Sequence, residues 1–135
     1  MLEKFKDIEP EVKLRFMYLF NICTLLPFGL FMLILPDVFI NLFGWPSQDI
    51  YIFGIAASVW AIFGFLSIFG YSDPHKYVPI LIMQFFYKIV WMLGVFLVRS
   101  IISPPGIWSI LLAVLMGVYI VGDLLVIPFK EFFKG

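Results

Sequence analysis

The chain has 135 residues, of which 63% are hydrophobic and only 13% are charged. Soluble domains are about 45–50% apolar and about 25% charged, so this composition excludes an ordinary soluble domain. Nine basic residues balance nine acidic residues, and this net charge of zero gives no basic surface for nucleic acid. The single cysteine, Cys23, excludes an intrachain disulfide and a cysteine-rich metal site.

Four apolar runs are long enough to cross a hydrocarbon core of about 30 Å, which takes about 20 helical residues. They predict transmembrane helices over residues 16–35, 50–70, 77–98 and 107–127. The connectors are short, so each helix is expected to run antiparallel to the next. The longest connector has an apolar stretch, which predicts a short interfacial helix over residues 37–44. The sequence thus predicts an all-α fold, an integral membrane four-helix up-and-down bundle forming a single domain over residues 1–135.

Basic residues gather on one side of the predicted bundle. Arg99 stands alone on the other side, against seven residues near the span ends on the first side, namely Lys4, Lys6, Lys13, Arg15, Lys76, Lys130 and Lys134. Because Lys and Arg are retained in cytoplasmic segments, this asymmetry predicts that both termini are cytoplasmic. We expect a multi-pass protein of the cell membrane, in a bacterial inner membrane.

Lys88 lies near the middle of the third predicted helix, where insertion scales assign a lysine a cost of about 2.5–3.5 kcal/mol. Its helix carries polar and aromatic residues at i−4, i−1 and i+3, which share one face with it. The first and fourth helices carry polar residues at comparable depths. The predicted ligand-binding residues of the three helices are Lys88, Gln84, Tyr87, Trp91, Asn21, Thr24 and Asp123.

Three interpretations of these residues stay open. In the first, they line an internal cavity that holds an anionic or hydrogen-bonding ligand. In the second, Lys88 and Asp123 form an ion pair, directly or through Gln84 and water, that fixes the third helix against the fourth. Lysine contact with a membrane interface or another subunit is a third possibility. Trp60, near mid-membrane in the second helix, could cover one side of such a cavity.

The second predicted helix carries a groove of small residues. Small residues allow the backbones of membrane helices to approach closely. We expect packing within the chain in preference to homodimerisation. The predicted helix-packing residues follow a 3–4–3 spacing and are Gly54, Ala57, Ser58, Ala61 and Gly64.

No known catalytic motif occurs in the sequence: there is no GxSxG, HExxH, P-loop or Cys–His pair. A desolvated lysine can form a Schiff base, but a lone lysine is weak grounds for covalent catalysis. The sequence therefore favours a protein that is not an enzyme, with no catalytic residue, metal ion or cofactor assigned.

Three features resemble the small bacterial DoxX-like membrane proteins and related uncharacterised four-helix families: the four-helix layout, the long connector after the first helix, and the Gly-Tyr-Ser-Asp-Pro turn at residues 70–74. The resemblance implies an accessory or ligand-handling role. Small multidrug exporters instead depend on a membrane-embedded carboxylate in the first helix, where this chain has Asn21 and Thr24.

Three functional hypotheses follow. The first is a binding protein for a lipid, quinone or other amphipathic small molecule in an intramembrane pocket around Lys88. The second is a non-catalytic accessory or structural subunit that packs against a membrane-protein partner or a second copy of itself. The third is a small transporter, although the sequence has no obvious inverted repeat. Membrane lipid is an expected partner in each case.

Overall fold

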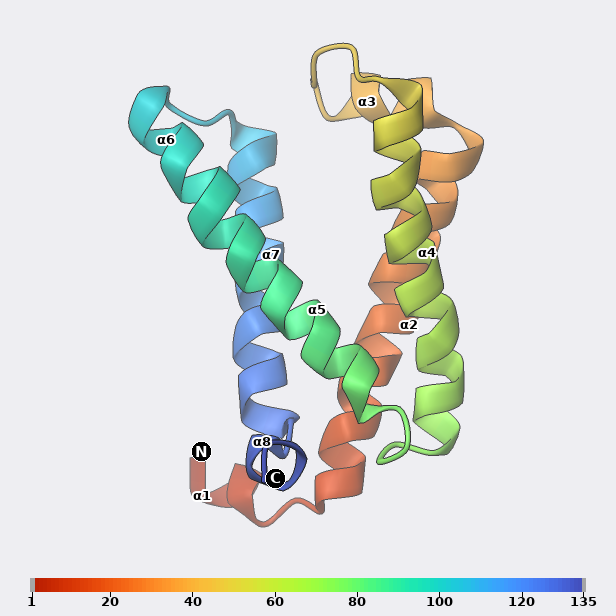
Figure 1. Ribbon diagram of the computed structural model, residues 1–135, viewed down its shortest axis with the longest axis vertical. Helices are drawn as coiled ribbons and strands as arrows, with labels where there is room; N and C mark the ends of the chain where they lie inside the picture. The colour runs from red at the N-terminus through yellow and green to blue at the C-terminus, as the bar shows by residue number, and fades with distance from the viewer. Residues whose placement is uncertain (1, 135) are drawn as a thin grey trace.

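The computed structural model describes residues 2–134, and most of them are helical (Figure 1). No strand occurs within this range. The elements in chain order are α1 (Leu2–Lys6), α2 (Pro10–Ile34), α3 (Pro36–Leu42), α4 (Ile50–Ser72), α5 (Val78–Trp91), the π-helical segment η1 (Met92–Leu97), α6 (Val98–Ile102), α7 (Ile107–Val126) and α8 (Phe129–Phe132).

Four helical segments are long and apolar enough to cross a membrane: α2, α4, the continuous stretch Val78–Ile102, and α7. Their outer surfaces are apolar, and Ile101, for example, exposes 79% of its surface. Such side chains need a hydrocarbon solvent. The predicted all-α four-helix membrane fold is confirmed, and the chain is a small multi-pass integral membrane protein.

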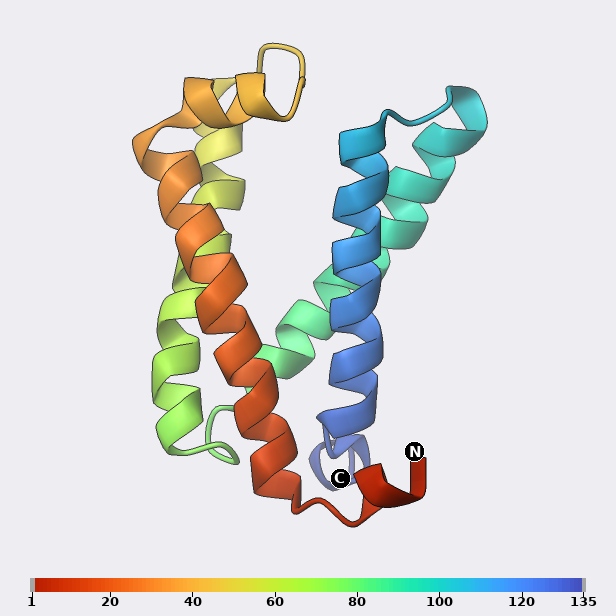
Figure 2. The same ribbon diagram turned by 180° about the vertical axis from the view of Figure 1, so that it is seen from behind.

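The four spans form two arms. The first arm is α2 with α4, and the second is α5–η1–α6 with α7. The arms meet at the end that carries α1 and α8, here called the base, and diverge toward the end that carries α3 and α6, here called the open end (Figures 1 and 2). The bundle is thus V-shaped, which the sequence did not predict.

The first arm is packed backbone to backbone. A Cβ atom on Gly29 would overlap the backbone of Ala61, and one on Gly64 would overlap the backbone of Leu26. Such close approach is what small residues permit in membrane helices. Ala57, which is fully buried, continues this contact toward the open end.

Two of the small residues grouped in the sequence lie outside the contact between α2 and α4. Ser58 is exposed, and no atom lies within 4 Å of the position that a Cβ on Gly54 would take. Near the open end the buried residue of α4 is Phe53, and its ring centroid lies 6.2 Å from that of Phe39 in α3. The predicted groove is therefore shorter than the sequence indicated, because Phe53, and neither Gly54 nor Ser58, faces the neighbouring helices at this end.

The base is closed by a core that both arms share. Tyr18 of α2 is fully buried, and its hydroxyl donates a hydrogen bond to the carbonyl oxygen of Pro74 at 2.8 Å. Gly70 leaves room for this ring. The core consists of Leu14, Met17, Tyr18, Leu25, Val78, Leu81, Phe85, Tyr119, Val126 and Ile127.

At the open end, α3 folds back over the first arm. Phe39 is its central side chain, with ring centroids 5.4 Å from Phe31 and 5.7 Å from Trp45. Phe43, just after α3, reaches the second arm, where its ring centroid lies 5.3 Å from that of Trp108 in α7. The arms therefore touch at the base and at this aromatic contact, with cavities between.

Candidate functional site

Lys88 lies where the arms separate. Its side chain is fully buried, and Nζ lies 3.5 Å from the ring centroid of Tyr119 and 5.2 Å from that of Tyr87. No hydrogen-bond partner for Nζ occurs among residues 2–134. The ammonium group is thus held by two aromatic rings alone, which compensate only part of its lost hydration.

Asp123, the buried carboxylate of α7, is bonded to Gln84 of α5. The amide Nε2 of Gln84 donates to Oδ2 at 3.0 Å and to Oδ1 at 3.2 Å. Lys88 lies one helical turn beyond Gln84, over the ring of Tyr119, and makes no hydrogen bond to this carboxylate. The polar contact that links α5 to α7 is therefore the hydrogen-bonded Gln84 amide, in place of the direct Lys88–Asp123 ion pair that the sequence suggested.

Polar side chains of α2 reach the same level. Thr24 Oγ1 donates to the carbonyl oxygen of Phe20 at 2.7 Å, and it also contacts the Tyr119 hydroxyl of α7. Asn21 Nδ2 donates to Ser67 Oγ of α4 at 3.0 Å. Each of the four spans thus contributes to a layer of polar side chains above the base.

Several buried polar atoms in this layer have no hydrogen-bond partner within the described chain. They are Lys88 Nζ, Gln84 Oε1, Tyr87 OH and Asn21 Oδ1. A buried donor or acceptor without a partner costs about 1–3 kcal/mol. Native proteins rarely gather such atoms in one place without a functional reason.

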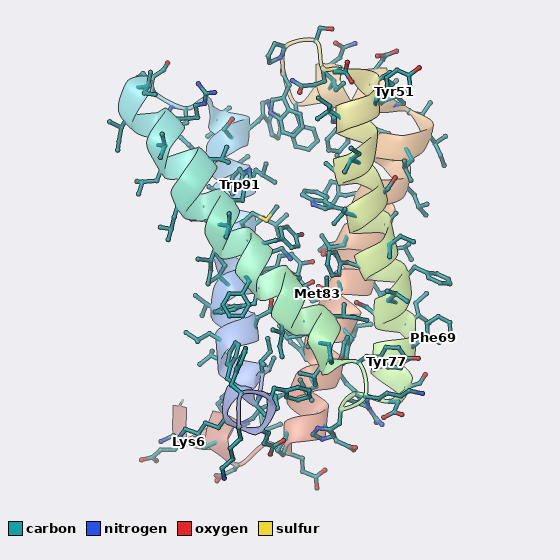
Figure 3. The ribbon with its side chains drawn as sticks, in the orientation of Figure 1. Lys6, Tyr51, Phe69, Tyr77, Met83 and Trp91 are labelled. Atoms are coloured by element: carbon teal, nitrogen blue, oxygen red, sulfur yellow. The ribbon has the colours of Figure 1, made fainter. Side chains whose placement is uncertain are left out.

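Three adjoining cavities occupy the space between the arms, and we call them together the aromatic cleft. Their volumes are about 500, 340 and 240 Å³, and all three are lined by Trp45 and Leu112. The largest lies at the open end. The cavity of about 340 Å³ reaches down to Tyr87 and Met116 between α4 and the second arm, past Trp91, which Figure 3 labels on α5.

All four tryptophans of the chain line this cleft. The sequence contains four, and Trp45, Trp60, Trp91 and Trp108 each line at least one of the three cavities. They come from four different segments of the chain. A wall built of large aromatic surfaces is typical of sites for apolar or amphipathic small molecules.

The floor of the cleft adjoins the polar layer. Tyr87 lines the inner cavity, and Lys88 follows it on α5, while Tyr119 lies one turn beyond Met116 on α7. Tyr87 itself is held by Phe63 of α4, with ring centroids 5.6 Å apart. The cleft therefore leads from the open end to Tyr87, the residue before the buried lysine.

A lateral groove of about 530 Å³ leaves the cleft between α4 and α5. Val59 and Tyr87 line both this groove and the inner cavity, and Met83, labelled in Figure 3, lines the groove on α5. Ser58, outside the helix contact described above, also lines it. The groove is almost wholly apolar, so it suits a hydrocarbon chain.

The structure joins five of the seven predicted ligand-binding residues and places the other two apart from them. Gln84, Asp123, Lys88 and Tyr87 form a continuous set on α5 and α7, which Thr24 joins through Tyr119. Trp91 lies higher, in the wall of the cleft. Asn21 is held on the first arm by Ser67.

Sequence reasoning missed Tyr119, to which Lys88 and Thr24 both bind. A signal for it was available, because Tyr119 precedes Asp123 by four residues and so shares its helix face. The clustering of the tryptophans had no such signal, because it depends on how the arms diverge.

Residues 2–134 contain no group of three or more His, Cys, Asp or Glu side chains that could hold a metal ion. No protein-family model, curated protein or solved structure matches this chain. The cleft and the polar layer are accordingly interpreted from the physical chemistry of their own residues.

Proposed function

We propose that this protein binds an amphipathic small molecule, such as a lipid or a quinone, in the aromatic cleft above Lys88. The observation that carries the proposal is the coincidence of two features. All four tryptophans line the cleft, and unpartnered buried polar atoms lie at and below its floor. The walls suit an apolar body, and the floor suits a hydrogen-bonding group.

Tyr87 is the polar residue of the layer that faces the cleft. Its ring lines the inner cavity, and its hydroxyl has no partner within the described residues. A ligand acceptor bonded to this hydroxyl, or to Lys88 after a small side-chain movement, would remove part of the cost of burying them. The ligand would thus be stabilised by the same groups that destabilise the empty protein.

The cavities have the right size for such a molecule. Small-molecule sites are commonly about 300–1,000 Å³, mostly apolar, with a few fixed polar groups. The inner cavity of about 340 Å³ and the open-end cavity of about 500 Å³ fall in that range. The apolar groove between α4 and α5 gives a long chain a route into the bilayer.

We also propose that the base, with α1 and α8, faces the cytoplasm. The support is the basic asymmetry of the sequence, in which Arg99 alone lies at the open end. In a bacterial inner membrane the cleft would then open outward. The layout that resembles DoxX-like proteins fits a ligand-handling role of this kind.

Native mass spectrometry after gentle purification tests the proposal. We expect the wild-type chain to retain a small molecule, and Trp60→Leu to lose it because the substitution removes part of the cleft wall. Phe65→Leu is the matched control, since Phe65 is exposed on the outer face of α4. A bare wild-type chain, or equal retention by both variants, would contradict the proposal.

The accessory-subunit hypothesis has less support. Ala57, Ala61 and Gly64, the small residues that could have received another helix, are buried in this chain, the last two against α2. A protein partner or second copy retained in place of a small molecule in the same spectra would favour it. Transport would require ligand movement across the membrane, which reconstituted vesicles can measure.

A further inference from the structure

The open-end cavity differs chemically from the rest of the aromatic cleft. It has a volume of about 500 Å³ and is lined on one side by Trp45 and Gln48 and on the other by Arg99, Ser103 and Ser109. Arg99 is the one charged residue in this lining, and no acidic residue of the described chain lines it. The mouth of the cleft therefore carries a positive charge above an apolar interior.

The start of α7 adds to this positive character. Gly106 is its N-cap and has no capping side chain, and α7 is a helix of 20 residues. The first N–H groups of such a helix and its dipole favour an anion. Ser109, in the first turn, lines the cavity and brings a hydroxyl donor to the same place.

Among the described residues, the acidic groups at the open end do not neutralise the charge of Arg99 inside this cavity. The Asp49 carboxylate caps α4, accepting hydrogen bonds from the N–H groups of Tyr51 and Ile52 at 3.0 Å each. Asp37 lies in the first turn of α3. Neither lines the mouth cavity.

We infer that the outer end of the ligand is an anionic group, a carboxylate or a phosphate, bound by Arg99 with Ser103, Ser109 and the start of α7. This inference rests on the proposed function and adds the charge and the direction of the ligand. Arg99 follows Tyr87 by 12 residues, which is about 18 Å of helix. The ligand class is therefore a long-chain acid or alkyl phosphate, with its charge at the mouth and its chain running through the cleft toward the floor, where Tyr87 can bind a second, acceptor group of the ligand.

Binding can be measured by quenching of tryptophan fluorescence, because all four tryptophans line the cleft. The wild-type protein in nanodiscs of neutral phosphatidylcholine is titrated with three probes that share one chain, brominated near its middle: hexadecanoate, hexadecyl phosphate and hexadecanol. Bromine quenches tryptophan fluorescence at short range. We expect at least one of the two anionic probes to bind about tenfold more tightly than the alcohol, a difference of about 1.4 kcal/mol, and the stronger one identifies the headgroup.

Arg99→Gln decides the inference, and Lys130→Gln is the control that removes one positive charge from α8 at the base. We expect Arg99→Gln to abolish the anionic preference, so that the anionic probes bind no more tightly than the alcohol, and Lys130→Gln to keep the preference. No anionic preference in the wild type, or an equal loss in both variants, overturns the inference and leaves the proposed function intact. Absence of quenching by all three probes contradicts the proposed function itself.

Discussion

Replacing Lys88 with methionine should stabilise the protein and weaken ligand binding. Lys88 Nζ is fully buried, contacts only the rings of Tyr119 and Tyr87, and has no hydrogen-bond acceptor within residues 2–134. Methionine has a similar length and no charge, so it fills the same space. Since Asp123 keeps its bonds to Gln84, the substitution leaves no new unpaired carboxylate.

The magnitude follows from two opposing contributions. Removing a mid-membrane lysine relieves about 2.5–3.5 kcal/mol on insertion scales. Losing the contacts of the ammonium with the aromatic rings costs about 0.5–2 kcal/mol. The net expectation for Lys88→Met is a gain in the free energy of unfolding of about 0.5–3 kcal/mol.

Reversible unfolding by SDS in mild mixed micelles, followed by circular dichroism, measures this change. Lys76→Met is the control, because Lys76 is exposed in the turn before α5, and it should change stability by less than about 0.5 kcal/mol. A buried ion pair with Asp123 would give the opposite sign, a loss of about 3–5 kcal/mol. Such a loss, recovered in the double variant Lys88→Met with Asp123→Leu, would refute the reasoning.

Three further substitutions probe the packing of the arms, each by the same unfolding titration. Gln84→Leu should lower the free energy of unfolding by about 3–5 kcal/mol, because it leaves the buried Asp123 carboxylate without a hydrogen-bond donor. Adding Asp123→Leu in the same chain should recover most of this loss. No recovery would show that the loss does not come from the Gln84–Asp123 hydrogen bonds. Gly64→Ala should cost about 1–3 kcal/mol because its Cβ meets the backbone of α2, whereas Gly54→Ala, facing open space, should stabilise α4 by up to about 1 kcal/mol; equal effects would contradict the packing of the first arm. Tyr18→Phe should cost about 1 kcal/mol, since it removes the hydrogen bond to the turn before α5, and an unchanged stability would mean that this bond contributes nothing.

The four spans could be predicted because hydrocarbon thickness sets their length and because charges are nearly excluded from them. The polar stripe of α5 could be predicted because helical periodicity places Gln84 and Lys88 on one face. The residues of α7 that contact Gln84 and Lys88 could not be predicted. Depth brought Asp123 to the right level, but only the rotation of α7 decides that its carboxylate meets Gln84 while Tyr119 meets Lys88.

The divergence of the arms could not be predicted, because hydropathy carries no information on the angle between helices. That divergence decides which residues line the cleft. Trp45 and Trp108, for example, lie at the open end and face the space between the arms. Gly54 and Ser58 are small like Ala57 and Gly64, but they lie outside the contact with α2: no atom lies within 4 Å of a Cβ on Gly54, and Ser58 lines the lateral groove.

The central claim is that an amphipathic molecule lies in the aromatic cleft, and photolabelling tests it most directly. The protein in neutral nanodiscs is irradiated with a long-chain alcohol that carries a diazirine, and the adducts are mapped by peptide mass spectrometry. We predict that adducts concentrate on cleft-lining residues such as Trp60 and Trp91 and that an unlabelled alcohol competes for them. Adducts confined to outer residues such as Ile55 and Phe65, without competition, would contradict the account.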